Sequence, residues 1–302
     1  MQKDSADLGG VSPQSQQARL INLILLAGVF LLIAIPRLLA VSQTATTDET
    51  KWVSRAANFS SALREGDFAN TYQSEHPGVT TMWAGALGLK ARFPDYAAQA
   101  PGQLMPHELD RFLLDQGTPP LQALVAGRRV MVLFNALALT LVFVYARRLL
   151  DLQTALLSAV FFALSPFFVA HTHLMHLDGL AGSLMVLSLL AFLGYIDQEK
   201  WLDLILSGIA AGLAWLTKTP AMSLAPILLI IALLSIWKIR DTNGRRAGLW
   251  KVGPSLMVWA LISLVTFVLL WPAMWGEPLH TLSRIYQEAL GYAGGGHGDP
   301  VF

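Results

Sequence analysis

Several side chains that could do chemistry stand next to apolar stretches of this sequence. Asp48 and Glu49 follow the first apolar stretch, and Lys218 separates two short ones. The chain has 0 Cys, so chemistry must come from carboxylates, histidines, lysines or hydroxyls. A carboxylate can act as a general base, and an ammonium can steady a departing phosphate.

A second group of titratable residues lies between the third and fourth apolar stretches. It contains His171, His173, His176 and Asp178. His173 and His176 would share one face if the segment were helical, a spacing that suits a metal ion or a phosphate. The alternative is a polar interfacial turn after Pro166. No H-E-x-x-H motif is present, which excludes a zinc protease of that type.

The composition places these residues in a membrane protein. The chain is 54% hydrophobic and only 14% charged, whereas about 25% charged is usual in soluble domains. A net charge of +1 offers no electrostatic footprint for nucleic acid. We therefore expect an all-α, polytopic helix bundle that forms a single membrane domain over residues 1–302.

About seven apolar stretches are candidates for membrane spans. They are residues 20–40, 130–146, 154–170, 179–196, 202–216, 221–237 and 255–275. Only four residues separate the fifth from the sixth, so their assignment as a hairpin is the weakest of the seven. The distribution of Lys and Arg favours a cytoplasmic N-terminus, although Arg128 and Arg129 count against it. The expected location is the plasma membrane.

The long segment 41–127 is predicted to be an outer loop with its own structure. Thr46-Thr47-Asp48 precedes an apolar-periodic run and indicates a helix start, and 79–89 is too short to span. Both stretches are predicted to form interfacial amphipathic helices. In this setting Asp48 is either a helix cap or a base, and Glu49, about 100° away on a helix, is supporting or solvated.

The order of several short motifs resembles a known family. The motifs are TTDETKW, EHPGVTTMW, SPFFVAHTHLMHLDGLAGSLMVL, GIAAGLAWLTKTPAMSL and LLWPAMWGEPL. They resemble the GT-C membrane glycosyltransferases that use polyprenyl-phosphate sugars, in the protein mannosyltransferase-like and aminoarabinose-transferase-like branch. Members of this group commonly run longer, so the C-terminal remainder of the family fold is expected to be missing here.

The resemblance implies roles for several of the candidate residues. Asp48 would be the general base, Glu75 would take part in a metal site, and Asp178 would organise the site. His76 stands where the family usually has Lys, which puts that phosphate contact in doubt. Lys218 would lie near the donor cavity, with snorkelling as the alternative. Apart from the resemblance, Glu49, His173 and His176 are expected to contact the substrate, and His297 is a further candidate metal ligand.

The expected function is transfer of a sugar from a polyprenyl (dolichyl) phosphate to an acceptor protein, lipid or glycan on the outer face. A phosphate leaves without a general acid, so one carboxylate base and a cation suffice. The sequence indicates no definite cofactor, and a divalent metal held by Glu75 and His297 is compatible with it. The alternatives are a lipid or solute transporter of the flippase kind, or an inactive fragment. The chain shows no internal repeat of the transporter type.

Overall fold

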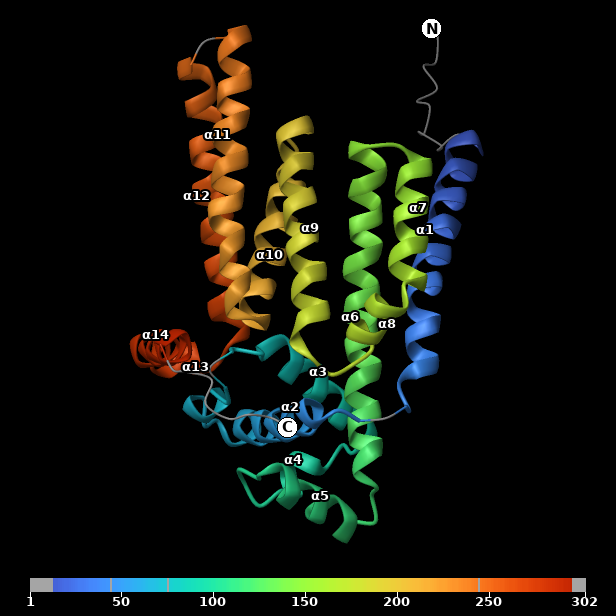
Figure 1. Ribbon diagram of the computed structural model, residues 1–302, viewed down its shortest axis with the longest axis vertical. Coiled ribbons are helices and arrows are strands. Elements are labelled where there is room, and N and C mark those ends of the chain that lie inside the picture. Colours follow the sequence, from blue (N-terminus) through green and yellow to red (C-terminus); the bar gives the residue numbers. More distant parts are fainter. Residues whose placement is uncertain (1–12, 44, 75, 244, 295–302) are drawn as a thin grey trace, which may run out of the picture.

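In the computed structural model, the described residues are 13–294 except 44, 75 and 244, and they form helices without strands. The long helices run side by side as a bundle, and shorter helices lie across one end of it (Figure 1). The bundle consists of α1 (Pro13–Ala40), α6 (Pro120–Leu149), α7 (Leu152–Leu164), α9 (Leu177–Gln198), α10 (Trp201–Thr217), α11 (Leu224–Asn243) and α12 (Arg245–Leu270).

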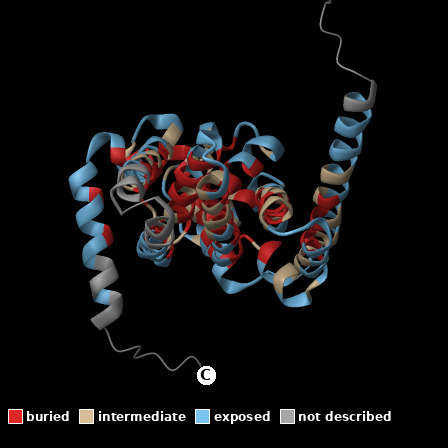
Figure 2. Ribbon diagram, turned by 90° about the horizontal axis from the view of Figure 1, so that it is seen from above, coloured by how far each residue is buried: buried red, intermediate tan, exposed pale blue. Residues whose placement is uncertain are grey.

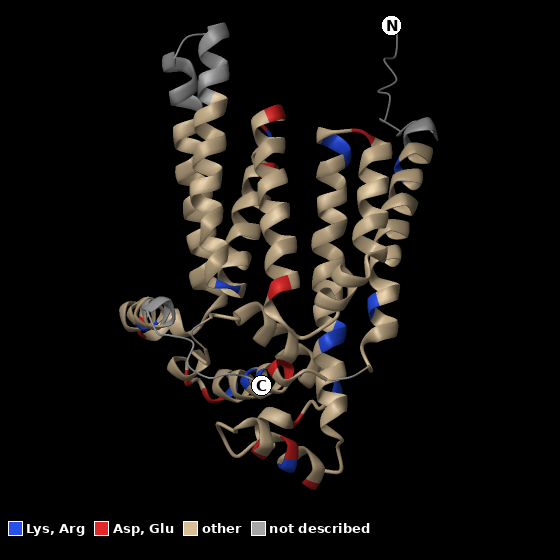
Figure 3. Cartoon of the chain, viewed as in Figure 1, with Lys and Arg blue, Asp and Glu red and all other residues tan. Residues whose placement is uncertain are grey.

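The bundle has the surface of a multi-pass membrane protein. Buried residues gather at its centre and exposed ones on its outer faces (Figure 2). Those faces carry large apolar side chains that are more than half exposed, among them Leu23, Phe161, Leu233 and Leu269. Charged residues gather toward the two ends of the bundle (Figure 3). An apolar outer face between charged ends is what a hydrocarbon core requires.

Every predicted apolar stretch lies mostly in helix, although the last one, 255–275, runs past the end of α12 at Leu270. The predicted number of spans is not confirmed. Within the described part of the chain, four helices are long and apolar enough to cross a membrane, in α1, α6, α9 and α12. The stretch 154–170 is not one straight helix, because α7 ends at Leu164 and α8 (Pro166–Thr172) leaves at 67°. This bent pair would make a fifth span. The helices α10 and α11, joined by η2 (Thr219–Ser223), match the doubtful hairpin and are shorter apolar helices.

The segment 41–127 is structured at one end of the bundle. It contains α2 (Thr47–Glu65), η1 (Ala69–Thr71), α3 (Val79–Arg92), α4 (Tyr96–Gln99), α5 (Pro106–Asp115) and the start of α6. The helices α13 (Ala273–Gly276) and α14 (Pro278–Gly294) lie at the same end (Figure 1).

The predicted helix start at residues 46–48 is confirmed, with Thr46 as the N-cap of α2. The helix α3 lies deeper than a surface helix, because Val79, Met82 and Leu89 are buried against α2 and α6. This end of the molecule is therefore a packed lobe that continues the core of the bundle.

Candidate active site

The first turn of α2 separates two neighbouring carboxylates. Thr46 is the N-cap, and its backbone N–H donates to Oε2 of Glu49 at 3.0 Å, which completes a capping box. The side chain of Asp48 is 58% exposed, whereas that of Glu49 is fully buried. The reading of Asp48 as the helix cap is therefore wrong, because Thr46 and Glu49 provide the cap.

Glu49 is held by a dense set of donors. Arg128 of α6 donates from Nε at 2.7 Å to Oε1 and from Nη2 at 2.6 Å to Oε2, and the backbone N–H of Met175 donates to Oε1 at 2.9 Å. Burial alone would raise the pKa of Glu49, but Arg128 and the backbone N–H groups of Thr46 and Met175 hold it below its ordinary value. Glu49 thus ties α2, α6 and the chain before α9 together.

Asp48 begins a line of four alternating charged or titratable groups. Its Oδ2 lies 3.8 Å from Nε2 of His176, whose Nδ1 lies 3.5 Å from Oδ2 of Asp178. Asp178 in turn forms an ion pair with the ammonium of Lys218. Lys51 also lies 3.7 Å from Asp48. The side chains of His176, Asp178 and Lys218 are 27%, 47% and 27% exposed, so a ligand can reach them.

The histidines do not share a helical face as the i, i+3 spacing suggested. The helix α8 ends at Thr172, and α9 begins at Leu177 with His176 as its N-cap. His173 is buried, and its Nδ1 lies 2.9 Å from the carbonyl oxygen of Val169. Among the described residues no three His, Asp or Glu side chains are grouped to hold a metal ion. The predicted metal residues Glu75 and His297 lie outside the described residues.

The turn that contains His76 lies at the same end of α10 as Lys218. Gly78 has φ +58°, and a side chain there would meet the ring of Trp52, so glycine is required. Its N–H donates to the carbonyl of Thr217 at 3.2 Å. The hydroxyls of Thr80 and Thr217 are also 2.7 Å apart. These bonds fix the start of α3 next to the end of α10 and bring His76 to the site's side of the molecule.

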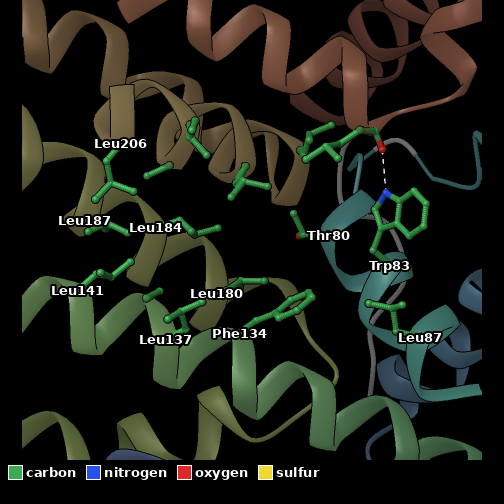
Figure 4. A pocket seen from close by; sticks show the side chains of 16 residues that line it. Thr80, Trp83, Leu87, Phe134, Leu137, Leu141, Leu180, Leu184, Leu187 and Leu206 are labelled. Atoms are coloured by element: carbon green, nitrogen blue, oxygen red, sulfur yellow. Dashed lines mark hydrogen bonds between the residues drawn. The ribbon is translucent and has the colours of Figure 1, made fainter. Parts of the chain in front are cut away.

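An apolar cavity of about 410 Å³ begins close to Asp178 and Lys218. Side chains of α3, α6, α9 and α10 and Leu270 of α12 line it, and all of them except Thr80 are apolar or aromatic (Figure 4). Leu180 of α9 stands two residues after Asp178, and Leu216 of α10 stands two residues before Lys218, the C-cap of that helix. The indole of Trp83 closes the side near α12 by donating to the carbonyl of Leu270 at 2.8 Å.

The far end of the cavity is apolar as well. It reaches Leu141, Leu187 and Leu206, where α6, α9 and α10 approach the opposite end of the bundle. Beyond it, Asp203 accepts from Tyr145 at 2.7 Å and from Arg148 at 2.6 Å. This cluster ties α6 to α10 between the cavity and the other end of the bundle.

Sequence reasoning missed the residues that hold the candidate site in place. Arg128 is fully buried on Glu49, and its Nη1 also donates to the carbonyl of Val41 at 2.8 Å. The sequence did contain a sign that Arg128 has a partner, because this charged residue stands at the edge of an apolar stretch, where an unpaired charge is costly. Its partner could not be read from spacing, because α2 and α6 meet only in the folded chain.

Comparison with known proteins gives one family match. Residues 122–272, half of the chain's 302 residues, match the family described as dolichyl-phosphate-mannose-protein mannosyltransferase. No curated protein and no solved structure matches the chain. The match covers α6 to α12, which contribute Arg128, His176, Asp178 and Lys218 and most of the cavity wall. The chain belongs to the dolichyl-phosphate-mannose-protein mannosyltransferase family.

Proposed function

We propose that this protein transfers a sugar from a polyprenyl-phosphate donor to an acceptor hydroxyl on the outer face of the membrane, with Asp48 as the general base. The observation that carries this proposal is the line from Asp48 through His176 and Asp178 to Lys218, beside an apolar cavity. A base, a cation and an apolar cavity match the three parts of the reaction: acceptor, phosphate and lipid tail.

The donor would lie with its phosphate near Lys218 and the first part of its tail in the cavity. Burial of apolar surface contributes about 0.8 kcal/mol per CH₂ group, so even a short piece of tail contributes several kcal/mol. Lys218 is paired with Asp178 in the structure, which argues against simple snorkelling. An ammonium has three donors, so Asp178 can hold Lys218 in place while another N–H reaches a phosphate oxygen.

The reaction requires one proton acceptor and a stable leaving group. The acceptor oxygen forms a bond to the anomeric carbon, and the bond from that carbon to the phosphate oxygen breaks. The bonding electron pair leaves on the phosphate, whose charge Lys218 offsets, and the hydroxyl proton passes to the carboxylate of Asp48. His176 would orient that carboxylate from 3.8 Å as a positioning residue.

Substitution of Asp48 tests the proposal directly. Asp48→Asn keeps the shape of the side chain but removes the base, so we expect turnover to fall by about 10²- to 10⁴-fold while donor affinity is nearly unchanged. The measurement is transfer from a polyprenyl-phosphate sugar in nanodiscs, with donor affinity determined separately. Asp115→Asn, at an exposed carboxylate of α5, is the matched control and should keep wild-type turnover. Near-normal turnover in Asp48→Asn would show that Asp48 is not the base.

A further inference from the structure

The break between α7 and α8 leaves the backbone carbonyl of Phe162 without its helical donor. In an α-helix the carbonyl of residue 162 accepts from the N–H of residue 166. Residue 166 is proline, which has no N–H. Ser165 still donates to Phe161 at 2.9 Å, so the helical ladder stops at the proline. In a membrane an unsatisfied carbonyl costs several kcal/mol, so the group needs another donor.

A guanidinium from another helix supplies that donor. Nη2 of Arg37, on α1, donates to the carbonyl of Phe162 at 2.8 Å, and its Nη1 lies 3.4 Å from the carbonyl of Ala163. Nε of the same side chain donates to the hydroxyl of Thr172 at 2.7 Å. Arg37 is fully buried. One side chain therefore contacts both arms of the bend, before and after Ser165.

We infer that Arg37 replaces the hydrogen bond that Pro166 cannot make, and so acts as a positioning residue that holds the α7–α8 bend in the shape the candidate site needs. Pro166 alone makes the break permissible, and Arg37 fixes its angle by binding Phe162 on one side and Thr172 on the other. A lysine could reach only part of this set, because it lacks the planar fork of donors.

The bend matters for the site because it directs the chain toward α2. After Thr172 the chain passes to Met175, whose N–H binds Glu49, and then to His176 beside Asp48. Gly179 allows this close return, since a side chain there would come within 2.6 Å of the carbonyl oxygen of His171. Straightening a 67° bend would move residue 171, six residues beyond Ser165, by up to roughly 10 Å.

Two substitutions together separate this role from general stability. Arg37→Met leaves the carbonyl of Phe162 without a donor, so we expect a clear fall in the thermal midpoint. Pro166→Ala in the same chain restores an N–H at residue 166, so the carbonyl can be satisfied by a continuous helix. The double variant should therefore regain thermal stability relative to Arg37→Met. Arg37→Lys should fall between the wild type and Arg37→Met.

The position of the turn gives a readout that does not depend on activity. The chain has 0 Cys, so spin labels can be attached to cysteines introduced at the exposed positions Thr50 and His171. In the double variant the distance between the labels should differ from the wild-type distance although stability is regained. Sugar transfer should stay about 100-fold low, because a displacement of about 1 Å already costs that much. This activity arm rests on the proposed function, whereas the distance and stability arms do not.

The control is Arg147→Met, in the last turn of α6 and away from the α7–α8 bend. This variant should keep the wild-type label distance and stability. The inference is overturned if Arg37→Met keeps both the wild-type distance and the wild-type midpoint. It is also overturned if adding Pro166→Ala to Arg37→Met does not raise the thermal midpoint. The missing hydrogen-bond donor would then not be the cause of the lost stability. A changed distance in a protein whose wild type transfers no sugar would support the inference and contradict the proposed function.

Discussion

Asp48 and Glu49 are adjacent carboxylates with opposite surroundings. Asp48 lies open beside His176, and Glu49 is enclosed by Arg128 and backbone donors. A helix turns about 100° per residue, so neighbours on α2 must face different ways. The buried carboxylate fixes the helix, and the exposed one is thereby held beside His176. Residue type alone cannot assign these roles, because both are acidic and both stand in the first turn.

The Glu49–Arg128 pair predicts how stability depends on pH. The pKa of Glu49 is lowered from its ordinary value of 4.5, so the pair stabilises the fold above pH 4.5 and this contribution is lost as the pH falls through the lowered pKa. Glu49→Gln leaves Arg128 buried without its carboxylate, which we expect to cost about 3–5 kcal/mol at neutral pH. Thermal unfolding from pH 3 to 7 in detergent should show a smaller acid loss in this variant than in the wild type. Glu108→Gln, at an exposed capping box of α5, should keep the wild-type acid loss. If Glu49→Gln lost as much thermal stability at low pH as the wild type, that loss would come from groups other than Glu49.

Lys218 provides the second prediction at this scale. If its ammonium contacts the donor phosphate, Lys218→Gln should weaken donor binding or turnover by roughly 10- to 100-fold, the value of one charge-assisted contact. Lys218→Arg should retain part of the function. Because Lys218 pairs with Asp178, Lys218→Gln combined with Asp178→Asn removes the leftover charge and tests the phosphate contact alone. Wild-type donor affinity and turnover in that double variant would remove Lys218 from the proposed site.

At the scale of elements, local patterns predicted more than long-range contacts. Apolar length predicted every bundle helix, and the Thr46 motif predicted the start of α2, because both depend on nearby residues. The bend at Ser165 was not predicted, although Pro166 was visible, because its angle depends on Arg37 from a distant helix. The same limit applies to the site. Its residues could be expected on one side of the membrane from the order of the apolar stretches. The Glu49–Arg128 pair that aligns them depends on how α2 packs against α6.

At the scale of the whole molecule, the polar site lies at one end of the apolar cavity. Both belong to α9 and α10, with Asp178 and Lys218 at one end and Leu187 and Leu206 farther along. A lipid-linked donor has the same order, with a charged head followed by an apolar tail. This common order favours a lipid-phosphate substrate over a water-soluble one.

Filling the cavity tests that relation without changing the polar site. Ala210 lines the cavity and is nearly fully buried, so Ala210→Phe should exclude one or two CH₂ groups of a bound tail. At about 0.8 kcal/mol per CH₂ group, KM for the donor should rise by roughly 4- to 15-fold. Turnover at saturation should stay near wild type, because the tail binds equally in the ground state and the transition state. Leu233→Phe, on the exposed face of α11, adds an aromatic ring outside the cavity and should leave KM unchanged. An unchanged KM in a folded Ala210→Phe protein would show that the tail binds elsewhere, and the cavity would then have no part in donor recognition.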